Sequence, residues 1–206
     1  LLVMFIVLAT SRKVKDTMTI LIIGLMVASL TSALVSVLAY FSKAEELQLF
    51  MFWSFGSLGN LSWNEILILS CCWLIGIGLA IACLKNLNAL MLGESYAKSM
   101  GVSLQNNRLL IIISTSILAG SATAFAGPVA FVGLAVPHLV RQVVNTSDHK
   151  ILLPNVVFGG ALLLIICDII AQVPGSNSTL PINAITSIFG APVVIWLLVR
   201  KRKLNF

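Results

Sequence analysis

Few side chains in this sequence could do acid–base or metal chemistry, and those few are scattered. The two histidines are His138 and His149, and no cluster of carboxylates accompanies either one. The cysteines form no Cys-x-x-Cys pair and lie inside apolar runs, which favours packing as small apolar residues. We therefore expect no protein-bound metal and no cofactor. The four cysteines are Cys71, Cys72, Cys83 and Cys167.

Sequence motifs for catalysis are absent as well. The chain has no Gly-x-x-x-x-Gly-Lys-Ser/Thr phosphate cradle, no Gly-x-Ser-x-Gly and no His-Glu-x-x-His. Asp168 is the one carboxylate inside an apolar run, and burying it costs about 2.5–3.5 kcal/mol, so it needs a partner or water. Two alternatives stay open: an ion-coupled carrier that depends on Asp168, and an intramembrane enzyme that pairs Asp168 with His138. We expect a buried, hydrogen-bonding His138 and no enzyme.

Charged residues are too few for a protein that faces water on all sides. Of 206 residues, 59% are hydrophobic and 10% are charged, whereas a soluble domain is about a quarter charged. The 13 Lys and Arg and 7 Asp and Glu cannot cover the surface of a 22.1 kDa globule. This excludes a soluble enzyme, a disordered chain and a DNA-binding domain, despite the net charge of +6. An integral membrane protein is the class that remains.

Long charge-free runs predict an all-α, polytopic membrane protein that forms a single transmembrane domain over residues 1–206. About five full transmembrane helices and a truncated N-terminal one are expected, with one shorter helix. The run 109–140 is divided at Gly127-Pro128, because proline removes a backbone donor and glycine permits a turn. The first run lacks a starting Met and a basic n-region, so we expect a missing N-terminal part, not a signal peptide. The expected spans are 1–9 (partial), 17–41, 65–84, 107–126, 130–145, 151–172 and 182–199.

The basic residues indicate on which side of the membrane each loop lies. If Arg12 and its neighbours are cytoplasmic, alternation of the spans makes 85–106, 146–150 and 200–206 cytoplasmic too. Together with residues 12–15, these segments and their edges hold 12 of the 13 Lys and Arg residues, and only Lys43 lies on the other side. That distribution follows the positive-inside rule and predicts a cytoplasmic C-terminus.

The segment 87–106 connects two spans and is patterned as a short helix followed by a turn. Asn88 can cap the start of this helix, and Gly101 suits its end. Three interpretations compete: the turn of a DNA-binding helix-turn-helix, an amphipathic helix on the lipid surface, and a protruding lever for a cytoplasmic motor. On the helix Leu90, Gly93, Ala97 and Met100 share one face, while Glu94 and Lys98 form an i,i+4 pair on another.

Several motifs, in this order, resemble the permeases of ABC importers for iron-siderophores, haem and cobalamin, which are type II importers. The segment 87–106 is similar to the coupling region of that family. The runs GPVAFVGLAVPHLVR at 127–141 and DHKILLP at 148–154 follow the family's patterns. The resemblance covers roughly 24–203 and includes Phe52, Trp53, Gly56, Ser57, Leu58, Leu87, Asn88, Ala89, Asp168, Leu180, Pro181, Gly190, Ala191, Pro192 and the stretch 196–203.

This resemblance implies the permease subunit of an ATP-driven importer in the cytoplasmic membrane of a prokaryote. A ferric siderophore is the first expectation for the substrate, with cobalamin or haem as alternatives, moved by alternating access. The implied partners are cytoplasmic ABC ATPase subunits that hydrolyse the ATP, a second permease subunit, an extracytoplasmic binding protein and the lipid bilayer. No nucleic acid is expected. The sequence does not decide among the chelates or between identical and paralogous permease subunits.

The resemblance also assigns roles to individual residues. Contacts with a binding protein are expected on the outer side. There Gln172 stands where the family often has Arg, and Thr179 stands where it often has an acidic residue. The sequence therefore does not decide which charges contact the binding protein. The expected ATPase-coupling residues are Leu90, Gly93, Glu94, Ala97, Lys98 and Gly101; the pathway or gate residues are Gly127, Pro128, Gly133, Pro137 and Asp168; the docking residues are Trp53, Gln172 and Thr179.

Overall fold

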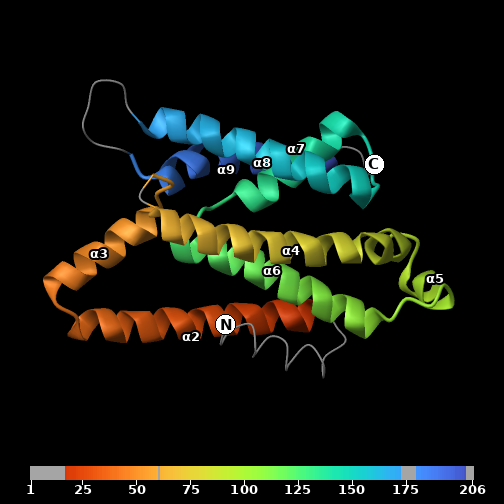
Figure 1. The fold of residues 1–206 in the computed structure, drawn as a ribbon, viewed down its shortest axis with the longest axis horizontal. Helices are drawn as coiled ribbons and strands as arrows, with labels where there is room; N and C mark the ends of the chain where they lie inside the picture. Colours follow the sequence, from red (N-terminus) through yellow and green to blue (C-terminus); the bar gives the residue numbers. More distant parts are fainter. Residues whose placement is uncertain (1–16, 60, 173–179, 203–206) are drawn as a thin grey trace. The chain divides into compact units, whose positions relative to one another are not determined.

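The computed structural model describes residues 17–59, 61–172 and 180–202, and within these ranges every element is a helix (Figure 1). This confirms the predicted all-α, polytopic membrane fold. The expected partial span 1–9 lies outside the described residues. The helices are α2 (Thr17–Phe41), α3 (Ala44–Phe55), α4 (Trp63–Leu90), α5 (Glu94–Ser99), α6 (Leu104–Ala126), α7 (Val132–Val144), α8 (His149–Ala171) and α9 (Ile182–Arg202).

Four of the described helices are long and apolar enough to cross a membrane, judged by length and composition: Leu21–Phe41 of α2, and α4, α6 and α8. Helix α7 and the stretch Ile182–Trp196 of α9 are shorter apolar helices. Helix α4 continues to Leu90, past the expected boundary at residue 84, because a single lysine such as Lys85 marks a membrane edge without ending a helix. Asn88 therefore lies inside α4, and its predicted role as the cap of a new helix is wrong.

Two helices begin with side chains that bond the free backbone N–H groups of their first turn. At α4, Ser62 N and Oγ donate to Glu65 Oε2 at 2.8 and 2.7 Å, and Glu65 N donates to Ser62 Oγ at 3.4 Å, which is a capping box. At α8, Asp148 is the N-cap residue and accepts a hydrogen bond from Lys150 N at 2.9 Å.

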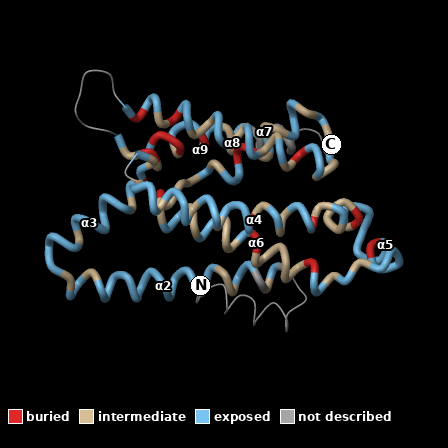
Figure 2. Tube along the Cα trace, viewed as in Figure 1, coloured by how far each residue is buried: buried red, intermediate tan, exposed pale blue. Residues whose placement is uncertain are grey.

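The described chain divides into two compact units. The first contains residues 17–52 and 67–121, and in it α4 and α6 lie side by side and antiparallel (Figure 1). Ser114 Oγ donates to Gly76 O at 2.8 Å, and a Cβ added at Gly76 would be 2.6 Å from Leu118 Cγ. The two backbones therefore approach closely at Gly76. The side chains described in α2, which are those at 18, 19 and 21–41, are all exposed or half-buried, as Figure 2 shows for this helix.

The second unit contains residues 53–66 and 122–202, with α7, α8 and α9 packed on one another. Gly159 of α8 permits a close approach, because a Cβ there would be 3.0 Å from Val140 Cγ2 and 3.4 Å from Val136 Cγ1 of α7. The small core of this unit joins the C-terminal end of α8 to the N-terminal end of α9. It consists of Cys167, Ala171, Ile182 and Ile185, with Leu58, Val129 and Leu163 packed against them.

The contact at Gly76 gives a test of the α4–α6 packing. Gly76→Leu should lower the free energy of unfolding by about 1–3 kcal/mol through overpacking against Leu118. Gly78→Leu is the matched control, because Gly78 is exposed and has nothing within 4 Å of its added Cβ. Thermal unfolding of the detergent-solubilised protein measures both. Equal melting temperatures for the two variants would contradict the packing described.

Candidate functional site

The segment 87–106, here called the elbow, joins the end of α4 to the start of α6 through the short helix α5. After α4 the chain turns at Met91–Gly93, with Gly93 N donating to Leu90 O at 3.1 Å. Gly93 has φ +108°, a conformation that residues with a side chain rarely adopt. The predicted helix 88–101 is therefore interrupted, and α5 occupies only Glu94–Ser99.

Helix α5 ends in a Schellman motif centred on Gly101. Gly101 N donates to Lys98 O at 2.9 Å, and Val102 N donates to Ala97 O at 3.0 Å. Gly101 has the positive φ, +81°, that this motif requires. The structure thus confirms Gly101 as the residue that ends the helix. Each end of α5 is therefore next to a glycine with a positive φ, a conformation that residues with a side chain rarely adopt.

The elbow exposes only part of the face that the sequence suggested, namely Gly93 and Met100. Ala97 is 0% exposed and packs against its own chain, so it is not available to a partner, and Leu90 is half-buried. Gly93, Glu94 and Lys98 are exposed, as is Gly101. Sequence reasoning missed the exposed apolar side chains, because the turn at 91–93 changes the helical register assumed for 88–101. We call these side chains the elbow patch: Met91, Leu92, Tyr96 and Met100, each at least 52% exposed.

In the second unit, residues 124–131 connect α6 to α7, and we call this link with its contacts the junction. Gly127 has φ +79° and lies against Trp53 O and Gly56, where a Cβ would be 2.8 Å from Gly56 Cα. Trp53 Nε1 donates to Ala124 O at 3.2 Å, and Ser57 N donates to Ala126 O at 3.0 Å. The end of α3 is thereby fastened to the end of α6.

Helix α9 holds the other half of the junction. Ala130 N donates to Asn183 Oδ1 at 3.1 Å, so the side chain of α9 satisfies a backbone group that the broken helix leaves free. Phe131 has φ +66°, a left-handed conformation that costs a non-glycine residue about 1–2 kcal/mol. Phe131 packs on Gly190, where a Cβ would collide with the Phe131 side chain. Sequence reasoning did not single out Phe131 or Asn183.

The remaining predicted pathway residues lie on α7 and at its start. Pro128 is half-buried and Gly133 is exposed. Helix α7 continues through Pro137, whose ring cannot donate to the carbonyl of Gly133 four residues earlier. His138 is exposed, so the expectation of a buried histidine is wrong.

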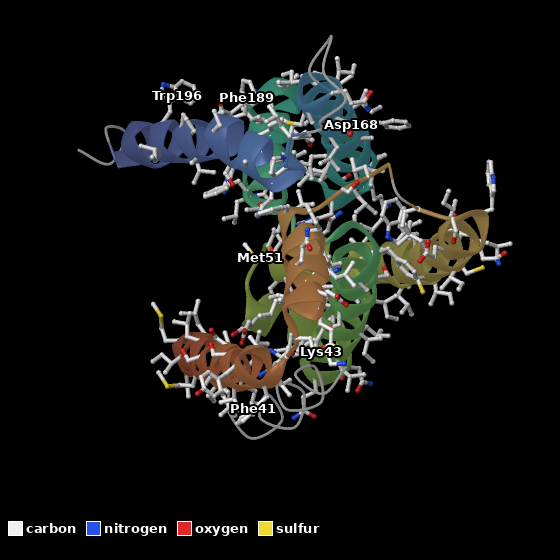
Figure 3. The ribbon with its side chains drawn as sticks, turned by 90° about the vertical axis from the view of Figure 1, so that its left-hand side faces the viewer. Phe41, Lys43, Met51, Asp168, Phe189 and Trp196 are labelled. Carbon is white, nitrogen blue, oxygen red and sulfur yellow. The ribbon has the colours of Figure 1, made fainter. Side chains whose placement is uncertain are left out.

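Asp168 lies in the last turn of α8, half-buried, and Gln172 Nε2 donates to its Oδ2 at 2.8 Å (Figure 3). Gly159 faces Val136 and Val140, on either side of His138, whereas Asp168 is nine residues further along α8. This register separates Asp168 from His138 by about 13 Å along the helix axes. The structure therefore does not bring the two together as an acid–base pair. Among the described residues no three His, Cys, Asp or Glu side chains form a possible metal site.

Two of the three predicted docking residues, Trp53 and Gln172, are described by the structure, and both belong to the second unit. Trp53 is 41% exposed while its indole N–H is bonded within the junction. Gln172 is exposed and forms the C-cap of α8. Thr179 lies outside the described residues.

The contacts of Gly127 in the junction can be tested by substitution. Gly127→Ala should reduce the thermal stability of the protein by about 1–2 kcal/mol from the left-handed conformation alone, and more from the contact with Trp53 O and Gly56. Gly133→Ala is the control, because Gly133 is helical and has open space around its Cβ. Melting curves of both variants test this. A Gly127→Ala protein as stable as Gly133→Ala would contradict the close approach at the junction.

Three comparisons with known proteins agree on the family to which this chain is similar. The chain is 36% identical over 209 residues to the vitamin B12 import system permease protein BtuC of Klebsiella pneumoniae subsp. pneumoniae, covering 98% of this chain and 60% of that protein. It is 36% identical over 184 residues to the hemin transport system permease protein HmuU of Yersinia pestis, covering 89% of this chain and 55% of that protein.

A solved structure supports the same relationship. It is an inward-facing conformation of a transporter assigned to the metal-chelate type of ABC transporters, with a TM-score of 0.87 and 32% identity, over 96% of this chain and 63% of that one. The chain thus spans about three fifths of the length of the relatives it matches. The profile of the FecCD transport family matches residues 1–200. The chain belongs to the FecCD transport family.

Proposed function

We propose that this chain is part of the membrane-spanning permease subunit of an ATP-binding-cassette importer, which moves a metal chelate by alternating access. Membership of the FecCD family and the four membrane-length helices support this proposal. The subunit carries no chemistry of its own, and ATP is hydrolysed by separate cytoplasmic ATPase subunits. It sits in the cytoplasmic membrane and works with a second permease subunit and an extracytoplasmic binding protein.

The elbow is the single observation that carries the proposal. It presents a short helix, held by a glycine at each end, between two helices that are long enough to cross the membrane. The elbow patch is apolar and exposed, which is typical of a surface that a protein partner covers. Its two methionines suit a partner that changes shape, because their side chains adapt to a moving surface. Glu94 and Lys98 are exposed beside the patch and can add charge contacts.

Helix α6 gives a direct mechanical route from such a partner into the membrane. It begins at Leu104, three residues after the Schellman glycine of α5, and ends at Ala126 in the junction. A displacement of α5 by the ATPase would move the start of α6, and the bond between Ser114 and Gly76 would carry α4 with it. The junction residues Gly127 and Pro128, with Gly133 and Pro137 in α7 and Asp168 in α8, are the proposed pathway or gate elements.

The outer side is proposed to receive the binding protein near Trp53, Gln172 and Thr179. The exposed amide of Gln172 bonds to the half-buried Asp168, so this point of the surface has a carboxylate with a neutral partner. Docking charges inherited from relatives with an arginine there do not apply unchanged to this chain.

The substrate is proposed to be a large metal chelate, and three chemical classes fit. The named relatives import vitamin B12 and hemin, and the similar solved structure is assigned to the metal-chelate type. The sequence resemblance favoured a ferric siderophore, and that preference stays a prediction. Cobalamin and haem have equal support from the relatives.

An ion-coupled carrier is the rival function. Its coupling ion would need ionisable groups at membrane depth, whereas Asp168 is in the last turn of α8 and bonded to Gln172. The geometry of Asp168 therefore favours the ATP-driven importer.

The elbow patch generates a prediction about coupling. The double variant Leu92→Ser, Tyr96→Ser should weaken binding of the ATPase at least tenfold, because it removes two large apolar contacts, about 1.5–3 kcal/mol each when fully buried. Co-purification of the ATPase with the tagged permease measures binding. The matched control is Val143→Ser, which changes another apolar side chain, 84% exposed, at the end of α7. Unchanged ATPase binding in the double variant would overturn the assignment of the elbow.

A labelling experiment tests the proposed orientation. With the four cysteines replaced by alanine, Lys43→Cys should react with a membrane-impermeant maleimide in intact cells. Lys98→Cys should react only after permeabilisation, since α5 would be cytoplasmic. Labelling of Lys98→Cys in intact cells would reverse the orientation, and the cysteine-free parent controls for background.

A further inference from the structure

Asn107, near the start of α6 and directly after the elbow, is a buried polar side chain whose position the packing of α4 against α6 does not explain. It is 2% exposed, and neither its Nδ2 nor its Oδ1 has a hydrogen-bond partner among the residues that the structure describes. Buried amides are normally paired, because desolvation without a new hydrogen bond is unfavourable. Asn107 therefore destabilises the arrangement in which the structure describes it.

The register of α4 and α6 identifies what Asn107 faces. Ser114 bonds to Gly76 O, and in an antiparallel pair a step of seven residues, about two turns, moves the same distance along both helices. That step leads from Ser114 to Asn107 on α6 and from Gly76 to Cys83 on α4. Cys83 is 1% exposed, so both residues lie inside the same contact between the helices.

Ser114 illustrates the bond that Asn107 lacks. Its hydroxyl donates to a carbonyl of α4 that also belongs to the helix ladder, which is possible because a carbonyl oxygen has two lone pairs. The carbonyls of α4 near Cys83 are available in the same way. A small slide or rotation of the start of α6 against α4 would bring the Asn107 amide onto one of them.

We propose that Asn107 is a positioning residue for ATP-driven coupling: its amide is unpaired in the arrangement described and pairs with an α4 backbone carbonyl near Cys83 in the ATP-bound arrangement. This inference rests on the proposed function. The element that would drive the change is α5, since it connects α4 to α6 and ends at Ser99, eight residues before Asn107.

Two variants test the inference. Asn107→Leu keeps the branching and the number of side-chain heavy atoms and removes the unpaired amide, whereas Ser114→Ala removes a bond that already exists. In the permease purified without its ATPase, Asn107→Leu should raise the melting temperature and Ser114→Ala should lower it. A lowered or unchanged melting temperature for Asn107→Leu would overturn the proposal, because it would mean that the amide is already satisfied, for example by a buried water.

The second arm measures coupling in the complete transporter in proteoliposomes. Asn107→Leu should keep ATPase binding but lose at least tenfold in chelate transported per ATP hydrolysed, because the ATP-bound arrangement loses its hydrogen bond. Asn107→Gln, which retains an amide, should recover part of that loss. Wild-type coupling in Asn107→Leu would refute the positioning role. Failure of the proposed function is distinct: the wild-type transporter would then show no ATP-dependent uptake, whatever the melting temperatures.

Discussion

Backbone hydrogen bonding is the constraint on which the described structure depends. Inside a bilayer no water satisfies a free N–H or C=O, so a break in a helix persists only where protein groups take over. The link between α6 and α7 meets this condition three times: Ser57 N bonds Ala126 O, Trp53 Nε1 bonds Ala124 O, and Asn183 Oδ1 accepts from Ala130 N. The junction can therefore combine an interrupted backbone with a defined conformation, which a gate element needs.

The elbow follows a different physical logic, because it leaves the apolar span and can use water. Its short helix α5 lies between two glycines with positive φ, and the one buried side chain of α5 is Ala97. What remains exposed is a patch of two methionines, a leucine and a tyrosine. An exposed apolar patch around a short helix is well suited to being covered by another protein, and α6, which follows the elbow in the chain, ends in the junction.

The long apolar helices were predictable from the sequence because charged residues flank the apolar runs and Gly127-Pro128 marks the break between α6 and α7. The extent of the elbow helix was not predictable in the same way. One residue, Gly93 in an unusual backbone conformation, rotates α5 relative to α4, and this turns Ala97 inward and Tyr96 outward. Phe131 was also beyond sequence reasoning: local sterics oppose its left-handed conformation, and its supports, Asn183 and Gly190, come from α9. Local patterns predict elements, whereas contacts between distant segments decide which faces they expose.

The central claim is that ATP hydrolysis on partner subunits drives a metal chelate through this protein. The most direct measurement is uptake of labelled ferric siderophore, haem and cobalamin into proteoliposomes that contain the permease, its ATPase subunits and the binding protein. We predict uptake of one of these chelates that requires ATP on the side of the elbow and continues when proton and sodium gradients are abolished. Uptake that needs an ion gradient and proceeds without ATP would contradict it.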